Sequence, residues 1–308
     1  MDTLLRAARD RGLPVEGAAT PADRWYQHGD LRLHYLEWPV RGNRPLVLLH
    51  GGTQTAHSWD LLALTLQSRF DVYALELRGH GDSGWSTEGH YKLGDYLGDV
   101  LAFLEVAGRE RVLLLGLSLG ARVAASVAAL RPQLVERLVL VDIDLTRHEN
   151  PGRDRIQRFR EGPDELEFDQ FVRMAQQFNP RRSEDQLRAS LRHHLRQLPS
   201  GLWSWKYDRR FRTEGKTFTP ETRYATATLA SKMGAPTLVV RGGESDVTSR
   251  QAAQALSNAL PRGSFVEVPD AGHTVPGDNP LGFYEAVIGF LDGADESARS
   301  DRSALDAD

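Results

Sequence analysis

The 308-residue chain contains no cysteine. This absence excludes disulfide bonds, thiolate metal sites and a cysteine nucleophile. No apolar run is long enough to cross a membrane, and the first ten residues carry charges where a secretory signal needs an unbroken apolar stretch. The formal net charge of −4 is too small to indicate a nucleic-acid or membrane partner. We therefore expect a soluble, cytoplasmic protein that binds neither nucleic acid nor membranes.

What the chain does contain is a series of short apolar runs separated by helical patterns. The runs are Leu46–Leu49, Val72–Leu75, Val112–Leu115, Leu138–Val141, Thr237–Val240 and Phe265–Val268. Runs that are apolar throughout are typical of parallel strands covered by helices on both faces. Residues 25–28 and 31–38 alternate around Gly29-Asp30, which predicts an antiparallel edge hairpin. The predicted fold class is α/β, with a doubly wound, mostly parallel eight-stranded sheet.

The length and a hydrophobic content of 40% are sufficient for a full α/β core with an inserted segment. Residues 145–234 do not look like sheet, and a capping box formed by Ser183 and Gln186 predicts a helix within them. Thr219-Pro220 predicts the start of another helix. We expect an N-terminal extension (1–20) with little order beyond at most a short helix at Leu4 and Leu5 docked on the core. It is followed by a core (21–144 and 235–292), a helical cap (145–234) and a flexible acidic tail (293–308).

One five-residue motif carries the chemistry. Ser118 lies between Gly116 and Gly120, directly after the run Arg111–Leu115 and before an alanine-rich helical stretch that ends at Pro132. A serine on a sharp strand-to-helix turn needs small residues two positions before and after it, because the backbone there is strained. No other stretch of the chain fits this pattern. The motif predicts a nucleophile elbow with Ser118 as the nucleophile.

Further motifs occur in a fixed order around this elbow. They are His50-Gly51-Gly52 with Trp59 downstream, Arg78-Gly79-His80-Gly81-Asp82-Ser83, and Asp270-Ala271-Gly272-His273. With the elbow, they make the chain resemble the α/β-hydrolase superfamily, in its capped, serine-nucleophile branch. The resemblance spans most of residues 24–292 and implies the α/β-hydrolase fold.

The resemblance implies a catalytic triad in the chain order serine, acid, histidine. His273 is the expected base, because its loop can return over the carboxyl edge of the sheet. Asp246 is the favoured acid, at the position that most members of the superfamily use. Asp142 and Asp144, which follow the preceding strand, are the alternatives, and Glu244 is expected to face solvent.

The oxyanion hole is expected to consist of the backbone N–H groups of Gly52 and Leu119. In the cap, Trp203, Trp205 and Tyr207 are candidate substrate-binding residues, although such rings equally well pack a cap onto its core.

Other histidines are expected to have roles outside the chemistry. His50 and His80 lie in glycine-rich loops, where the resemblance implies a structural role. His193 and His194 are expected on an exposed face of a cap helix. The segment 145–234 carries 18 Lys and Arg against 12 Asp and Glu, which permits an anionic substrate without requiring one.

Together these features predict a serine hydrolase that cleaves an ester-type bond of a small or medium apolar molecule through an acyl-enzyme. No cofactor or metal is expected, and the chain is expected to be a monomer or homodimer. A lactonase, an amidase or a carbon–carbon bond hydrolase would use the same triad. A cofactor-free oxygenase or a lyase of this fold, and a receptor without turnover, remain as further alternatives. Relatives with an aspartate nucleophile are disfavoured, because a serine stands at 118.

Overall fold

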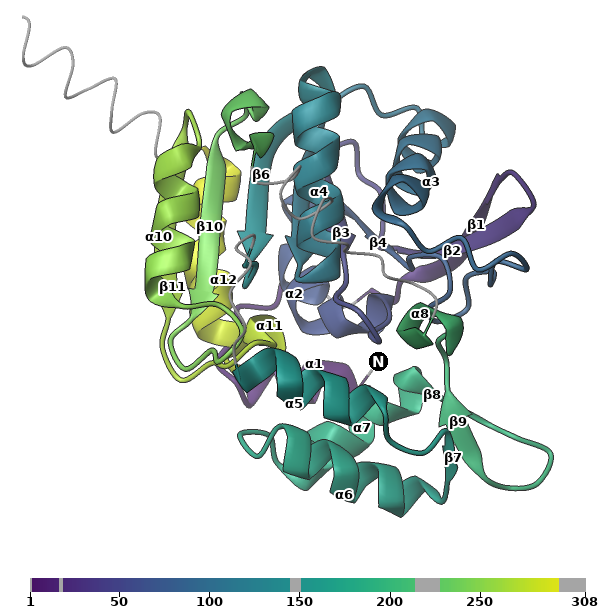
Figure 1. Ribbon diagram of the computed structural model, residues 1–308. Coiled ribbons are helices and arrows are strands. Elements are labelled where there is room, and N and C mark those ends of the chain that lie inside the picture. The colour runs from purple at the N-terminus through teal and green to yellow at the C-terminus, as the bar shows by residue number, and fades with distance from the viewer. Residues whose placement is uncertain (1, 17–18, 145–150, 214–227, 294–308) are drawn as a thin grey trace, which may run out of the picture.

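The computed structural model describes residues 2–16, 19–144, 151–213 and 228–293. Its centre is an eight-stranded sheet in the order β1-β2-β4-β3-β5-β6-β10-β11 (Figure 1). The strands are β1 (Ala22–His28), β2 (Leu31–Glu37), β3 (Arg44–Leu49), β4 (Phe70–Leu75), β5 (Val112–Leu117), β6 (Val135–Val141), β10 (Thr237–Gly242) and β11 (Gly263–Val268). The predicted fold class is confirmed, because β4, β3, β5, β6, β10 and β11 pair in parallel and the hairpin β1–β2 joins β4 antiparallel at one edge.

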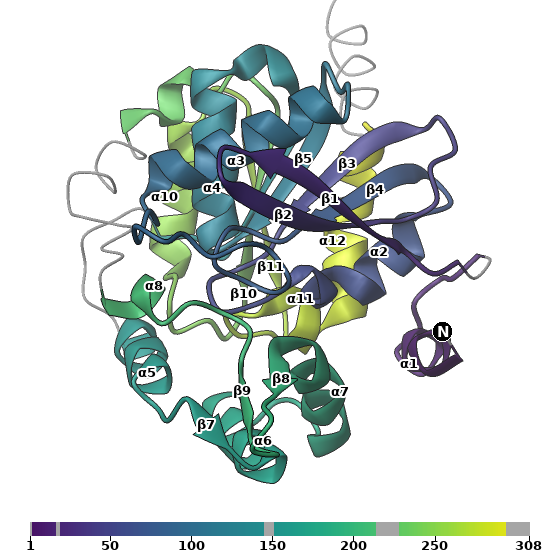
Figure 2. The ribbon, with the colours of Figure 1, turned by 90° about the vertical axis from the view of Figure 1, so that its right-hand side faces the viewer.

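Helices cover both faces of this sheet, as the uniformly apolar strands require. On one face lie α3 (Leu93–Val106), α4 (Leu119–Leu130) and α10 (Arg250–Ala259), whose buried side chains share one hydrophobic cluster. The other face packs against α2 (Asp60–Leu66) and α12 (Pro280–Asp292) (Figure 2). Shorter helical elements are η1 (Ala56–Trp59), η2 (Pro132–Leu134), η3 (Ala230–Lys232) and α11 (Val275–Asp278). No helix in the described ranges is long and apolar enough to cross a bilayer.

The N-terminal segment has more structure than its composition indicates. Helix α1 (Asp2–Arg9) packs beside α2, and Ala8 and Leu13 are buried in the hydrophobic cluster on that face. This is the short docked helix that the sequence allows at Leu4 and Leu5, and it extends to Arg9. The acidic tail expected over 293–308 lies, apart from Gly293, outside the described residues.

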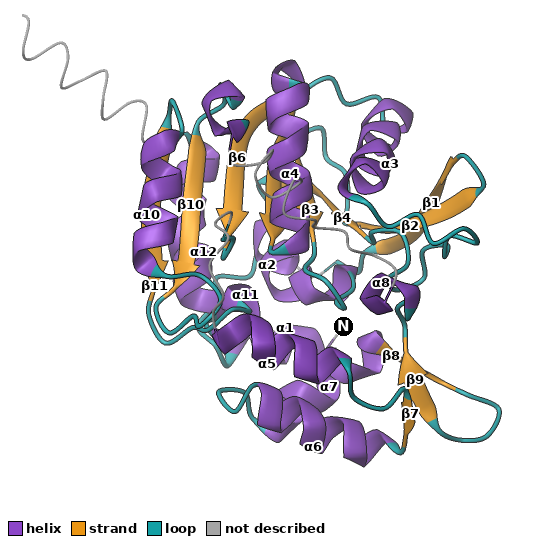
Figure 3. Cartoon of the chain, viewed as in Figure 1, coloured by secondary structure: helices purple, strands orange, loops and turns teal. Residues whose placement is uncertain are grey.

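The cap lies across the carboxyl edge of the sheet (Figure 3). Its elements are α5 (Pro151–Arg160), β7 (Glu165–Leu166), α6 (Phe168–Phe178), α7 (Glu184–His194), β8 (Leu195–Gln197), β9 (Trp203–Trp205) and α8 (Arg210–Thr213). The cap is not entirely helical, because β7, β9 and β8 form a small antiparallel sheet. Ser183 accepts the expected capping bond from Gln186 N at the start of α7. The helix expected from Thr219-Pro220 begins outside the described residues.

The cap has a hydrophobic cluster of its own. Phe171, Leu187, Leu191 and Trp205 are buried together beneath α6 and α7. Burial of apolar side chains between helices and a small sheet stabilises the cap independently of the central sheet. The cap therefore covers the ends of the strands with a packed cluster of its own.

Candidate active site

The turn between β5 and α4 holds Ser118 in a strained conformation. Its backbone has φ 52° and ψ −105°, in the region that residues with a side chain rarely adopt. A Cβ atom on Gly116 would lie 2.4 Å from the carbonyl carbon of Gly120, and one on Gly120 would lie 2.2 Å from the carbonyl oxygen of Leu49. Both distances are too short for any side chain, so the turn requires glycine at both positions. The structure thus forms the tight turn that the motif predicts.

Strained backbone gathers at this edge of the sheet. Four non-glycine residues have a positive φ among the residues that the structure describes: Thr53, Ser118, Asp142 and Asp270. Each follows the carboxyl end of a different strand, namely β3, β5, β6 and β11. Such conformations persist only where the surrounding structure imposes them, and they cluster at functional sites.

The imidazole of His273 points its Nδ1 at the carboxylate of Asp142, with 2.6 Å between Nδ1 and Oδ2. The Asp142 side chain is fully buried. The same Oδ2 accepts a hydrogen bond from the Ser245 hydroxyl at 2.7 Å, and Oδ1 accepts one from Gly242 N at 3.3 Å. The loop after β10 therefore supplies donors that orient this carboxylate.

Asp246, which the sequence analysis favours as the acid, has a different partner. Both of its carboxylate oxygens accept hydrogen bonds from Arg155 of α5, at 2.7 and 2.8 Å. The hydrogen bond from Arg155 is the main reason that the pKa of Asp246 lies below its usual value. The expected partnership is corrected accordingly: the carboxylate bonded to His273 is Asp142, one of the two stated alternatives, and Asp246 anchors the cap to the core.

Ser118 and His273 line the same pocket beneath the cap, which encloses about 870 Å³ including its open mouth. Apolar side chains provide much of its wall: Leu117, Ile156, Phe159, Ala175, Phe178, Leu187, Leu191 and Trp205. The charged side chains in its described lining are Arg160 and Arg182, and no aspartate or glutamate occurs there. The pocket is therefore mainly apolar, with positive charge at two points.

The expected oxyanion donors also lie at this pocket. Gly52 lines it, and Leu119 is the first residue of α4, so its N–H has no acceptor within that helix. A Cβ atom on Gly52 would lie 2.8 Å from a guanidinium nitrogen of Arg160 and 3.2 Å from the Phe211 ring. Glycine at 52 therefore leaves room for both side chains beside the loop.

Comparisons with known proteins match this arrangement. A family model described as alpha/beta hydrolase fold matches residues 44–280. The chain belongs to the α/β-hydrolase family. It is 35% identical over 265 residues to esterase Rv0045c of Mycobacterium tuberculosis, covering 82% of this chain and 84% of that protein. The crystal structure of that esterase aligns with a TM-score of 0.75 at 30% identity, over 94% of this chain and 96% of the other.

A second relative is 2-(acetamidomethylene)succinate hydrolase of Mesorhizobium japonicum. It is 30% identical over 263 residues, covering 82% of this chain and 90% of that protein. Both alignments cover a larger share of this chain than lies outside residues 145–234, so each includes part of the cap.

The other two acidic candidates of this hydrolase contact arginines. Asp144 is buried, and its carbonyl oxygen accepts a hydrogen bond from Arg122. Glu244 is half-exposed and pairs with Arg181 at 2.7 Å, close to the solvent-facing position expected for it.

The three cap aromatics divide between two environments. Trp205 lines the pocket, whereas Trp203 packs on Phe168 with 5.1 Å between ring centroids. Tyr207 is buried against His80 with 6.3 Å between the rings. The predicted substrate contact is therefore possible for Trp205, while Trp203 packs within the cap and Tyr207 packs against His80. Trp203 and Trp205 are two residues apart and share a face of β9, so their positions along the strand separate them.

His50 fixes the loop that carries Gly52 through hydrogen bonds at both of its ring nitrogens. Its Nδ1 lies 2.7 Å from the carbonyl oxygen of Gly51, and its Nε2 accepts a hydrogen bond from Leu77 N at 3.0 Å. Burial lowers the pKa of His50, which favours the neutral ring that can donate at one nitrogen and accept at the other. This arrangement fits the structural role expected for His50.

The two cap histidines differ from each other. His193 is exposed, in line with the expectation, and stacks on His57 with 3.8 Å between ring centroids. His194, expected on the exposed face, instead lines the pocket, and burial lowers its pKa to about 3. The sequence does not distinguish them, because they are adjacent at the end of α7 and only the direction of its last turn separates them.

A buried ion pair supports the loops at this edge. Glu76 accepts hydrogen bonds from His34 Nδ1 at 2.9 Å, from Ala56 N at 3.2 Å and from Asp82 N at 2.5 Å. Burial alone would raise the pKa of Glu76, but the bond from His34 and the other donors lower it to about 2. Burial would likewise lower the pKa of His34, and the bond to Glu76 raises it instead. The pair joins the edge hairpin to loops on both sides of β4.

We expect Glu76→Gln to lower the free energy of unfolding by about 3 kcal/mol at pH 6, where both partners are charged in the folded protein. Because the folded pKa of Glu76 is depressed, this contribution is present above the unfolded value near 4.5 and is lost as the pH falls toward 2. Urea unfolding of wild type and variant at pH 6 and pH 3 measures it. If wild type and variant differ in free energy of unfolding by the same amount at both pH values, the ion pair does not contribute as described.

We expect Gly120→Ala to lower the free energy of unfolding by about 1–3 kcal/mol, because the new methyl group meets the Leu49 carbonyl oxygen. Gly289→Ala is the matched control. It lies in α12 with no atom within 4 Å of the added Cβ, so helix propensity should stabilise it by up to about 1 kcal/mol. Urea denaturation compares the two. Equal changes in the free energy of unfolding for the two variants would show that the elbow has room for a methyl group at position 120.

Proposed function

We propose that this hydrolase cleaves a carboxylic ester-type bond of a small or medium apolar substrate, with Ser118 as nucleophile, His273 as base and Asp142 as acid. The observation that carries the proposal is the 2.6 Å contact between His273 Nδ1 and the buried Asp142, in a pocket that Ser118 also lines. A carboxylate on one ring nitrogen fixes the tautomer, so the other nitrogen is free to accept a proton.

The reaction proceeds in two steps. His273 takes the proton from the Ser118 hydroxyl as the oxygen attacks the substrate carbonyl carbon, and Asp142 stabilises the resulting imidazolium. The collapsing tetrahedral intermediate releases the alcohol, which receives that proton from His273. Water, deprotonated by His273, then attacks the acyl-enzyme carbonyl carbon. The second tetrahedral intermediate breaks its bond to Ser118 Oγ, which takes the proton back from His273 as the acid is released.

The negative charge that develops on the carbonyl oxygen needs fixed donors. The N–H groups of Gly52 and Leu119 provide them in the proposal, because Gly52 lines the pocket and Leu119 directly follows Ser118 at the start of α4. One such donor typically contributes about 3 kcal/mol to the transition state. Ser118 Oγ has no hydrogen-bond partner among the described residues, and contacts of this type often tighten only when substrate is bound.

The name of one relative and the wall of the pocket favour a second candidate, cleavage of an amide-like bond in a carboxylate-bearing molecule. That relative is named for an acetamido-substituted succinate. In this chain Arg160 and Arg182 line the pocket. Arg182 pairs with the buried Asp278 at 3.0 Å, and the Arg160 guanidinium lies beside Gly52, where a carboxylate bound near the oxyanion hole would meet it.

A pair of matched esters separates the two candidates. p-Nitrophenyl butyrate is neutral, and p-nitrophenyl hemisuccinate carries a carboxylate at the end of a chain of similar length. A higher kcat/KM for the neutral ester supports the apolar substrate. A higher value for the acid, lost in Arg160→Gln, supports the second candidate.

The decisive comparison for the mechanism is Asp142→Asn against Asp246→Asn. We expect Asp142→Asn to lower kcat by about 10⁴-fold, because the amide cannot hold the imidazole in the required tautomer. Asp246→Asn should stay within about tenfold of wild type, because that carboxylate contacts Arg155 rather than His273. Rates of p-nitrophenyl ester hydrolysis measure both. A larger loss of kcat in Asp246→Asn than in Asp142→Asn would indicate that Asp246 is the acid.

Ser118→Ala completes this test. It should abolish ester turnover and prevent covalent labelling by a fluorophosphonate, which reacts with an activated serine. Turnover that survives in Ser118→Ala would contradict the acyl-enzyme. It would favour proton-transfer chemistry of the oxygenase or lyase kind.

A further inference from the structure

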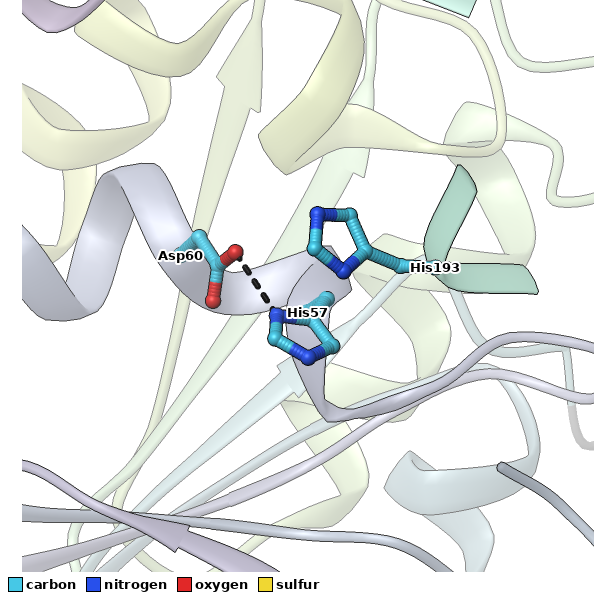
Figure 4. A group of neighbouring side chains, drawn as sticks. All are labelled: His57, Asp60 and His193. Carbon is cyan, nitrogen blue, oxygen red and sulfur yellow. Dashed lines mark hydrogen bonds and ion pairs between the residues drawn. The ribbon is translucent and has the colours of Figure 1, made fainter. Parts of the chain in front are cut away.

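A second cluster of polar side chains lies at the boundary between core and cap, outside the proposed chemistry. His57 lies in η1 and Asp60 begins α2, while His193 comes from the last turn of α7 in the cap (Figure 4). His57 Nδ1 and Asp60 Oδ2 are 2.9 Å apart, and the two imidazoles stack at 28°. One nitrogen or oxygen from each of the three residues lies within 4.8 Å of the others. Two separate parts of the fold thus bring three potential ligands together.

One atom of this cluster lacks a partner. Asp60 Oδ1 is buried and has no hydrogen-bond partner in the described part of the chain, although Oδ2 contacts His57. A buried carboxylate oxygen without a donor is costly, since it loses water and receives nothing in exchange. A cation beside Asp60 would satisfy it.

The donor set identifies the class of cation. Two imidazoles and one carboxylate suit Zn²⁺, Ni²⁺ or Cu²⁺, whereas Mg²⁺ and Ca²⁺ prefer sites made of oxygen. We propose that His57, Asp60 and His193 bind one divalent transition-metal cation, which joins the cap to the core. The fourth ligand is water, because His193 is exposed to solvent.

Binding requires a modest rearrangement. Ligand atoms on a tetrahedral Zn²⁺ are about 3.3 Å apart, given Zn–N and Zn–O distances of about 2.0–2.2 Å. One ring must also turn, because the lone pairs of stacked rings run side by side instead of converging. The terminal torsion of histidine has a broad energy minimum, so this turn is accessible.

The surroundings provide a path for the ion. The three residues line a second pocket, which shares Gln54, Ser190 and His194 with the Ser118 pocket. Arg11 and Arg182 also line this pocket, and Arg182 pairs with Asp278. Lys206 influences both imidazoles, and its ammonium group is bound by both oxygens of Asp82 at 2.8 Å. That ion pair reduces the repulsion that a divalent cation would meet.

The position of the ion has a consequence for the cap. Helix α7 contributes Leu187, Ser190, Leu191 and His194 to the wall of the Ser118 pocket. A cation that links the end of α7 to η1 and α2 fixes that wall against the core. The bound state should therefore be the more resistant to unfolding, because the ion binds only the assembled site.

Zn²⁺ titration by calorimetry tests the site in the full chain. We expect one equivalent to bind wild type, and His193→Gln to weaken binding by more than about tenfold, since loss of an outer-sphere partner alone costs about 10- to 100-fold. His90→Gln is the matched control, because His90 is an exposed histidine in a loop away from the cluster. Asp60→Asn should weaken binding as His193→Gln does. Zn²⁺ should raise the Tm of wild type and His90→Gln but not that of His193→Gln, and Mg²⁺ should have no such effect.

Several outcomes would overturn the proposal. They are absence of Zn²⁺ binding to wild type, equal affinity in wild type and His193→Gln, or loss of the bound equivalent when His273 is replaced by Gln. The last result would place the ion at the proposed catalytic histidine. None of these readouts depends on ester turnover, so failure of the metal site and failure of the proposed hydrolysis remain distinguishable.

Discussion

The hydrogen bond between His273 and Asp142 is the contact on which the rest of the site depends. Asp142 is buried at the end of β6 with a positive φ, and its carboxylate is held from the neighbouring strand by Ser245 and Gly242. A fully buried carboxylate is stable only with such donors. Because three different strands supply these groups, the imidazole is oriented only when the sheet has assembled in its final order.

At the carboxyl edge of the sheet, strained backbone is maintained by the packing of the strands that precede it. Ser118 and Asp142 adopt backbone conformations that cost free energy, and the buried parallel strands before them provide the packing that maintains those conformations. The pair Glu76–His34 has the same function for the loops, since one carboxylate gathers donors from three segments. The polar groups at the carboxyl edge therefore depend on the apolar sheet behind them.

The sequence was sufficient to predict the sheet and the tight turn at Ser118, because each of these depends on a local pattern. It could not tell which carboxylate contacts His273, since Asp142 and Asp246 both follow strands that end at the same edge. Asp246 instead contacts Arg155, which lies 91 residues away in the chain and engages both oxygens of that carboxylate. The internal arrangement of the cap was less predictable from the sequence than the core. Its small sheet, the inward turn of His194 and the separate fates of Trp203 and Trp205 all arise from packing between short elements that have weak local signals.

The positions of the elbow differ in the space that they leave for a side chain. Gly116 and Gly120 have no room for a side chain, while the side chain at position 118 projects into an open pocket. The backbone turn thus restricts the flanking positions far more than position 118. A different side chain at 118 would leave the turn intact, whereas a side chain at 116 or 120 would force two neighbouring segments of backbone apart.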